Sequence, residues 1–188
     1  MLRLQPSARV SLSPLRLSTT LLFAVVATIT VGIVGFLVRS GVLLGIAPGV
    51  RPLQETFPAW GVTAFAVWMA LAVLTSVVLP VLALVCWRRD GQVRAVLGPY
   101  LGLLAVQIPT EVIFAQIFFP NITAITGIVY TGYRLYQLWY FQQAFAQQPQ
   151  QAFRDRAVRN ILIIGICFWS ANLVFLVGVL LTRVVVQS

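Results

Sequence analysis

Four long stretches of this sequence contain no charged residue, and each is long enough to cross a lipid bilayer. A transmembrane helix needs roughly 20 mainly apolar residues to span the hydrocarbon core. Only 9% of the 188 residues are charged and 60% are hydrophobic, whereas a typical soluble domain has about 25% charged residues. The sequence therefore predicts an all-α, polytopic membrane protein and excludes a soluble enzyme, a nucleic-acid-binding domain and a secreted disulfide scaffold. The uncharged stretches are Leu17–Val38, Thr56–Trp87, Val112–Tyr133 and Asn160–Thr182.

The middle of the chain is too long for a single span. Its apolar region, 95–145, is interrupted only by Glu111 and Arg134, and Phe119-Pro120-Asn121 offers a tight turn near its centre. We therefore predict a helical hairpin there and a bundle of five transmembrane helices in all. The expected spans are about 18–38, 60–87, 96–119, 122–141 and 160–182, within one membrane domain at 18–183. A basic cytoplasmic segment, 1–17, would precede this domain, and a Gln- and Arg-rich cytoplasmic loop, 142–159, would join the last two spans.

The distribution of arginine predicts the orientation of these spans. All 13 basic residues are arginine, and in the five-span arrangement each of the three inner segments carries three of them. The outer segments together carry only Arg39, Arg51 and Arg183. The positive-inside rule therefore places the amino terminus inside and the carboxyl terminus outside. This rule also explains the net charge of +9, so we expect no nucleic-acid partner. The arginines of the two inner loops are expected to contact lipid headgroups: Arg88, Arg89, Arg94, Arg154, Arg156 and Arg159.

The amino-terminal segment leaves the identity of the membrane open. The first apolar run is longer than the 7–15 residues of a signal-peptide core. However, no acid precedes Glu55, and the first residues are rich in Arg and Ser, which is also typical of a transit peptide. We expect a bacterial inner membrane or a thylakoid, with an organelle membrane as the alternative.

Glu111 and Arg134 are the only charges deep within the predicted spans. A charge at the bilayer centre costs about 2.5–3.5 kcal/mol on insertion scales, so neither side chain should face lipid. If the hairpin folds back at Pro120, Gln107 lies level with Arg134, and Tyr130 lies level with Glu111. We therefore predict one polar cluster inside the hairpin, made of Gln107, Glu111, Tyr130, Arg134 and Gln137. It is either a structural ion pair or a pocket for a lipid headgroup, a quinone or pigment carbonyl, or a proton.

The composition removes most catalytic chemistry. The chain has no histidine, which is the commonest metal ligand and the commonest general base near neutral pH. Cys86 and Cys167 are not in a metal-binding spacing, and no nucleophile has a nearby base. We therefore predict no catalytic residue and no metal site, expect no enzymatic activity, and can assign no cofactor.

Three classes of function remain. The first is a non-enzymatic accessory or assembly subunit of a larger membrane complex, respiratory or photosynthetic, whose partners are membrane lipids and other membrane subunits. The alternative is a protein that transports or binds a small ligand, lipid or ion at the cluster around Glu111 and Arg134. A third class is an enzyme acting on lipid with Glu111 as general base, which rests on one carboxylate alone.

Overall fold

The computed structural model describes residues 15–43, 58–146 and 153–185, and the regular structure in these residues is entirely helical. Four helical segments are long and apolar enough to cross a membrane: Leu17–Arg39, Ala59–Cys86, Gly91–Ile117 and Arg154–Gly178. This confirms the predicted class, an all-helical, multi-pass membrane protein. The elements in order are α1 (Leu17–Arg39), α2 (Ala59–Val73), the π-helical turn η3 (Leu74–Val78), α3 (Leu79–Cys86), α4 (Gly91–Ile117), α5 (Ile122–Ala146) and α6 (Phe153–Val185).

A hairpin joins α4 to α5, as the turn sequence predicts. Helix α4 ends at Ile117, α5 begins at Ile122, and the two helices pack against each other. Helix α5 has 25 residues but is not among the four apolar segments, because it carries Arg134 and several polar side chains. Phe119 and Ile122 are buried at the turn, where they pack with Val31 and Val38 of α1.

The structure describes only parts of the two segments predicted outside the spans, 1–17 and 142–159. Helix α5 continues to Ala146 and α6 begins at Phe153, so both ends of the segment 142–159 are helical. Gln, Arg and Ala are all good helix formers, which accounts for this extension. Residues 147–152 and most of the predicted basic segment 1–17 lie outside the described residues.

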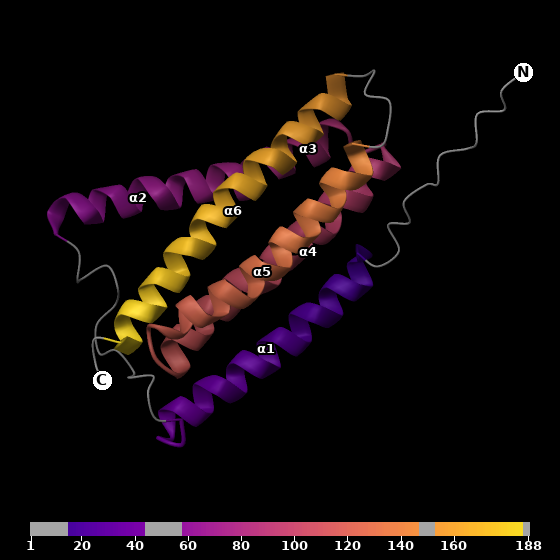
Figure 1. Ribbon diagram of the computed structural model, residues 1–188. Coiled ribbons are helices and arrows are strands. Elements are labelled where there is room, and N and C mark those ends of the chain that lie inside the picture. Colours follow the sequence, from indigo (N-terminus) through magenta and orange to yellow (C-terminus); the bar gives the residue numbers. More distant parts are fainter. Residues whose placement is uncertain (1–14, 44–57, 147–152, 186–188) are drawn as a thin grey trace, which may run out of the picture.

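Helices α4, α5 and α6 lie side by side, and α1 packs along α4 and α5 (Figure 1). The helical path from α2 through η3 to α3 crosses the others at a steep angle. Its α3 end lies against α4 and α6, whereas the beginning of α2 diverges from α6 (Figure 1). A groove lined by side chains of both α2 and α6 lies between these helices and is described below.

Pro80 lies near the start of α3 and interrupts the regular hydrogen bonding of this helical path. Proline lacks an N–H donor and its ring collides with the carbonyl four residues earlier, which here belongs to Ser76. The helix widens into the π-helical turn η3 over Leu74–Val78, immediately before this proline.

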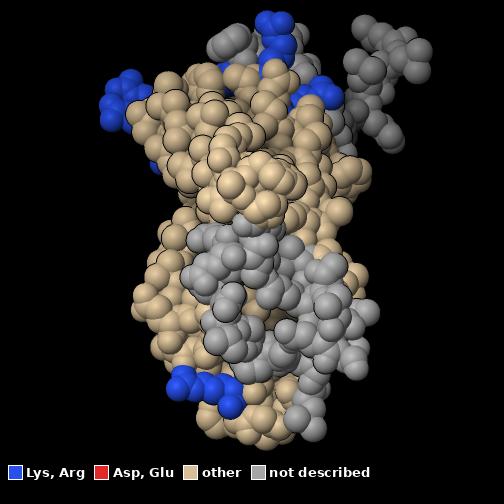
Figure 2. Space-filling view, turned by 90° about the vertical axis from the view of Figure 1, so that its left-hand side faces the viewer, with Lys and Arg blue, Asp and Glu red and all other residues tan. Residues whose placement is uncertain are grey.

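The largest buried cluster lies where α3, α4, α5 and α6 meet, and it includes Val96, Leu97, Phe141 and Leu162. Elsewhere the lateral surface is apolar: the exposed side chains include Phe36, Trp60 and Val174. On the face shown in Figure 2, the arginines of the described residues lie towards the two ends. This pattern suits a protein whose sides contact acyl chains and whose ends contact headgroups and water.

Candidate functional site

Arg134 and Glu111 are connected through an amide rather than by a direct ion pair. The Arg134 guanidinium donates a hydrogen bond to Gln107 Oε1, and Gln107 Nε2 donates to Glu111 Oε1 at 2.5 Å. Among the described residues, the direct ion pairs are those of Arg154 with Asp90 and Asp155. Gln107 therefore lies level with Arg134, as predicted. Glu111 and Arg134 do not form a direct ion pair, because the Gln107 amide bridges them. The reason is geometric, because Gln107 occupies the space between the two charges.

The buried guanidinium is held by aromatic rings. Arg134 is 0% exposed, and its guanidinium carbon lies 3.9 Å from the ring centroid of Trp169 and 5.7 Å from that of Tyr100. Trp169 Nε1 donates to the Tyr100 hydroxyl at 3.1 Å, which fixes the indole in place. A desolvated cation–π contact is worth about 2 kcal/mol or more. Trp169 is therefore a main partner of the cation. The sequence did not indicate this role, because the residue lies in another helix and far along the chain.

The predicted five-residue cluster is divided between two interfaces. Tyr130 and Gln137 face α1 instead of joining the other three residues. The Tyr130 hydroxyl donates to the Ala24 carbonyl at 3.0 Å and lies 2.6 Å from Thr28 Oγ1. Gln137 Nε2 donates to Thr20 Oγ1 at 2.9 Å. These two side chains attach α1 to α5, so only Gln107, Glu111 and Arg134 remain as one connected polar group.

A cleft of about 530 Å³ opens beside this group, between α2, α4, α5 and α6. Its polar lining includes Gln107, Glu111 and Asn172, and its aromatic lining includes Trp68 and Trp169. Small-molecule sites typically measure about 300–1,000 Å³ and combine apolar walls with a few polar groups. The cleft extends to Pro120 and Asn121, so it lies towards the hairpin-turn end of the molecule.

The walls of the cleft are ordered by specific contacts. Trp68 stacks on Phe168 with ring centroids 4.8 Å apart, and its Nε1 donates to Asn172 Oδ1 at 3.2 Å. Gly127 lies beside the carboxylate: a Cβ there would stand 3.9 Å from Glu111 Oε1 and 2.8 Å from a methyl group of Leu176. The absence of a side chain at Gly127 therefore keeps space open next to Glu111.

An apolar groove of about 370 Å³ adjoins the cleft. It is lined by Trp60, Gly61, Ala64, Phe65, Trp68 and Phe175, and the last three also line the cleft. The combined space thus has one polar part at Glu111 and one entirely apolar part between α2 and α6. This arrangement suits an amphiphilic molecule.

The arginines expected to contact headgroups occur where α3 ends and where α4 and α6 begin. Arg88, Arg89, Arg94 and Arg156 are exposed, whereas Arg154 and Arg159 are partly buried. The described residues contain no group of three His, Cys, Asp or Glu side chains that could hold a metal ion. Cys86 and Cys167 are free thiols on the surface.

Comparisons with protein-family models, with curated proteins and with solved structures found no significant match to this chain.

Proposed function

We propose that this protein binds a small amphiphilic molecule in the cleft, with Glu111 accepting a hydrogen bond from a hydroxyl or ammonium group of that molecule. This is the ligand-binding alternative that the intramembrane charges suggest. The rest of the ligand lies along the aromatic walls and in the adjoining apolar groove.

The observation that carries this proposal is the position of the Glu111 carboxylate. It lines a cleft bordered mainly by apolar side chains, and within the described residues its only hydrogen-bond donor is Gln107. A carboxylate that served only to neutralise Arg134 would be expected to contact the guanidinium directly. Here the guanidinium is satisfied in part by Gln107 and Trp169, which leaves acceptor capacity on Glu111 directed at the cleft.

Native mass spectrometry of the full chain, purified in a mild detergent, tests this function. We expect the wild type to retain an amphiphile that carries a hydroxyl or primary ammonium group. Glu111→Gln should retain at least about tenfold less of it, because the bond to a charged acceptor is lost. Ala115→Phe should also lose it, since the new ring fills the cleft without altering the carboxylate.

Asp155→Asn is the matched control, because it makes the same carboxylate-to-amide change outside the cleft. This variant should retain the molecule at the wild-type level. The proposal is wrong if the wild type carries no such molecule, or if well-folded Glu111→Gln retains it unchanged. If Glu111→Gln lowers only the melting temperature, the carboxylate is a structural group.

A second candidate is the accessory-subunit function expected from the small size of the chain. It is favoured by the apolar groove between α2 and α6, where Trp60 is 76% exposed and the apolar walls would accept side chains of a helix from another subunit. The same spectra distinguish the two candidates, because a stoichiometric protein subunit in place of an amphiphile supports the accessory function.

We further propose that α5 also crosses the membrane, which gives five spans with the amino terminus inside and the carboxyl terminus outside. Helix α5 has 25 residues and would extend about 37 Å at 1.5 Å per residue, enough to span the hydrocarbon core. Its direct contacts with α4 and α6 allow its polar side chains to face protein instead of lipid. The start of α1, the α3–α4 turn and the start of α6 lie at the same end of the molecule (Figure 1). Most of the arginines occur at this end.

A further inference from the structure

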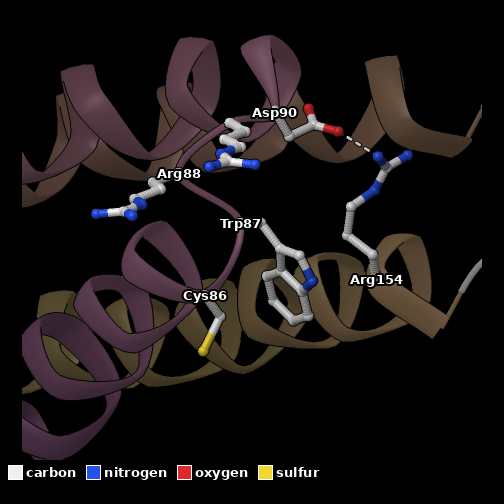
Figure 3. A pocket seen from close by; sticks show the side chains of 6 residues that line it. Cys86, Trp87, Arg88, Asp90 and Arg154 are labelled. Carbon is white, nitrogen blue, oxygen red and sulfur yellow. Dashed lines mark hydrogen bonds and ion pairs between the residues drawn. The ribbon is translucent and has the colours of Figure 1, made fainter.

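A cavity with basic walls lies at the opposite end of the molecule from the hairpin turn. Its volume is about 410 Å³, and it is lined by Cys86, Trp87, Arg88, Arg89, Asp90 and Arg154. The turn between α3 and α4 supplies Trp87, Arg88 and Asp90, and Arg154 reaches Asp90 from the start of α6 (Figure 3). Two segments that are far apart in the sequence therefore form this site.

The acids near the cavity are already satisfied by other groups. Asp90 Oδ1 caps α4 by accepting from the backbone N–H groups of Gln92 at 2.8 Å and Val93 at 3.1 Å. Asp90 Oδ2 pairs with Arg154, and Arg154 also pairs with Asp155 at 2.6 Å. These contacts fix the wall of the cavity and neutralise Arg154.

Arg88 and Arg89 differ from Arg154 in this respect. Both are exposed, both line the cavity, and neither is paired with an acid in the part of the chain that the structure describes. The planar guanidinium group matches a phosphate group through two parallel hydrogen bonds. Two adjacent arginines without an acidic partner at the edge of this cavity can therefore bind one phosphate group through charge-assisted hydrogen bonds.

The surroundings indicate that this phosphate belongs to a lipid. Trp87 lies at the end of a membrane-spanning helix, the position where tryptophan is enriched at headgroup depth. Directly before the cavity, α3 exposes Val81, Leu82 and Val85, which are 39%, 54% and 62% accessible. Acyl chains attached to a phosphate in the cavity would cover this apolar surface.

We propose that this cavity is a specific phosphate-binding site for the headgroup of an anionic phospholipid, with Arg88 and Arg89 as the phosphate ligands and the Asp90–Arg154 pair as its rigid wall. The site is separate from the amphiphile cleft and does not depend on the function proposed for it.

The test measures phosphatidylglycerol bound to the full chain by native mass spectrometry, after exchange into phosphatidylcholine micelles containing a fixed fraction of phosphatidylglycerol. The double variant Arg88→Gln/Arg89→Gln should lose at least about tenfold in bound phosphatidylglycerol, as expected for removing charge-assisted hydrogen bonds. A second arm replaces phosphatidylglycerol by inorganic phosphate and records the melting temperature. Protection by inorganic phosphate alone would identify a soluble phosphate compound as the ligand of the same site.

Arg94→Gln/Arg156→Gln is the matched control, because it removes the same charge from exposed arginines that do not line the cavity. The control should retain wild-type binding of phosphatidylglycerol. Equal losses in both double variants would show general attraction of the basic end to anionic lipid and would overturn the proposal. Unchanged binding in Arg88→Gln/Arg89→Gln would also overturn it, and circular dichroism of both variants checks that they fold.

Discussion

Arg134 shows how a packed helix can carry a charge that no acid in the described part of the chain contacts directly. Its guanidinium is fully buried between Trp169 and Tyr100, and the Gln107 side chain links it to Glu111 through two hydrogen bonds. Aromatic faces carry negative potential and therefore replace part of the hydration that the cation loses. The result is an acid and a base bridged by an amide, with the carboxylate lining the cleft.

Replacing Trp169 should therefore weaken the fold more than replacing a lipid-facing tryptophan. Trp169→Leu removes the cation–π contact and the hydrogen bond to Tyr100, and we expect a loss of about 2–4 kcal/mol in unfolding free energy. Trp139→Leu is the control, because Trp139 is 58% exposed. Reversible denaturation of both variants in the same micelles measures the difference, and equal stabilities would contradict this account of Arg134.

At the scale of elements, α1 is attached to the hairpin by close packing and by a few hydrogen bonds. A Cβ on Gly35 would stand 2.5 Å from Ile122 Cδ1 and 2.7 Å from a ring carbon of Phe118, so only glycine permits this approach. Tyr130 and Gln137 add the polar contacts to α1 described above. The attachment of α1 thus depends on shape, because in lipid there is no hydrophobic force to drive helices together.

Gly35→Ala should destabilise the protein by about 1–3 kcal/mol, the usual cost of overpacking a tight interface. Gly132→Ala makes the same chemical change where no heavy atom lies within 4 Å of the new Cβ, and it should leave the stability unchanged or slightly higher. Melting temperatures of the two variants in one detergent give the comparison. If Gly35→Ala is as stable as Gly132→Ala, α1 can shift away from Ile122 and Phe118 without a loss of unfolding free energy.

At the scale of the whole molecule, the five-span proposal fixes the side on which each end of the chain lies. A reporter that is active only outside the cytoplasm, fused after Ser188, should be active in cells. The same reporter fused within the basic turn after Arg89 should be inactive. Activity at the turn and not at the carboxyl terminus would reverse the orientation, and activity at neither position would remove one span.

Much of this architecture follows from the sequence, because the bilayer restricts the backbone structures that can cross it. A backbone surrounded by lipid must satisfy its own hydrogen bonds, so uncharged stretches of sufficient length become helices. The turn residues at Pro120 likewise predict the α4–α5 hairpin, and the constant rise per residue of a helix places Gln107 level with Arg134. Such local and periodic features need no knowledge of neighbouring helices.

The contents of the site depended on the tertiary structure. Periodicity places Tyr130 and Arg134 on one side of a helix, but it does not say that α1 covers one and α6 the other. Trp68, Trp169 and Asn172 reach the cleft from helices that no sequence spacing relates to Glu111. Helix packing in a membrane is decided by side-chain shape and by a few hydrogen bonds. The sequence therefore determined that the chain forms membrane helices that carry two charges away from their ends, and packing alone decided that Arg134 is fully buried whereas Glu111 borders a cleft.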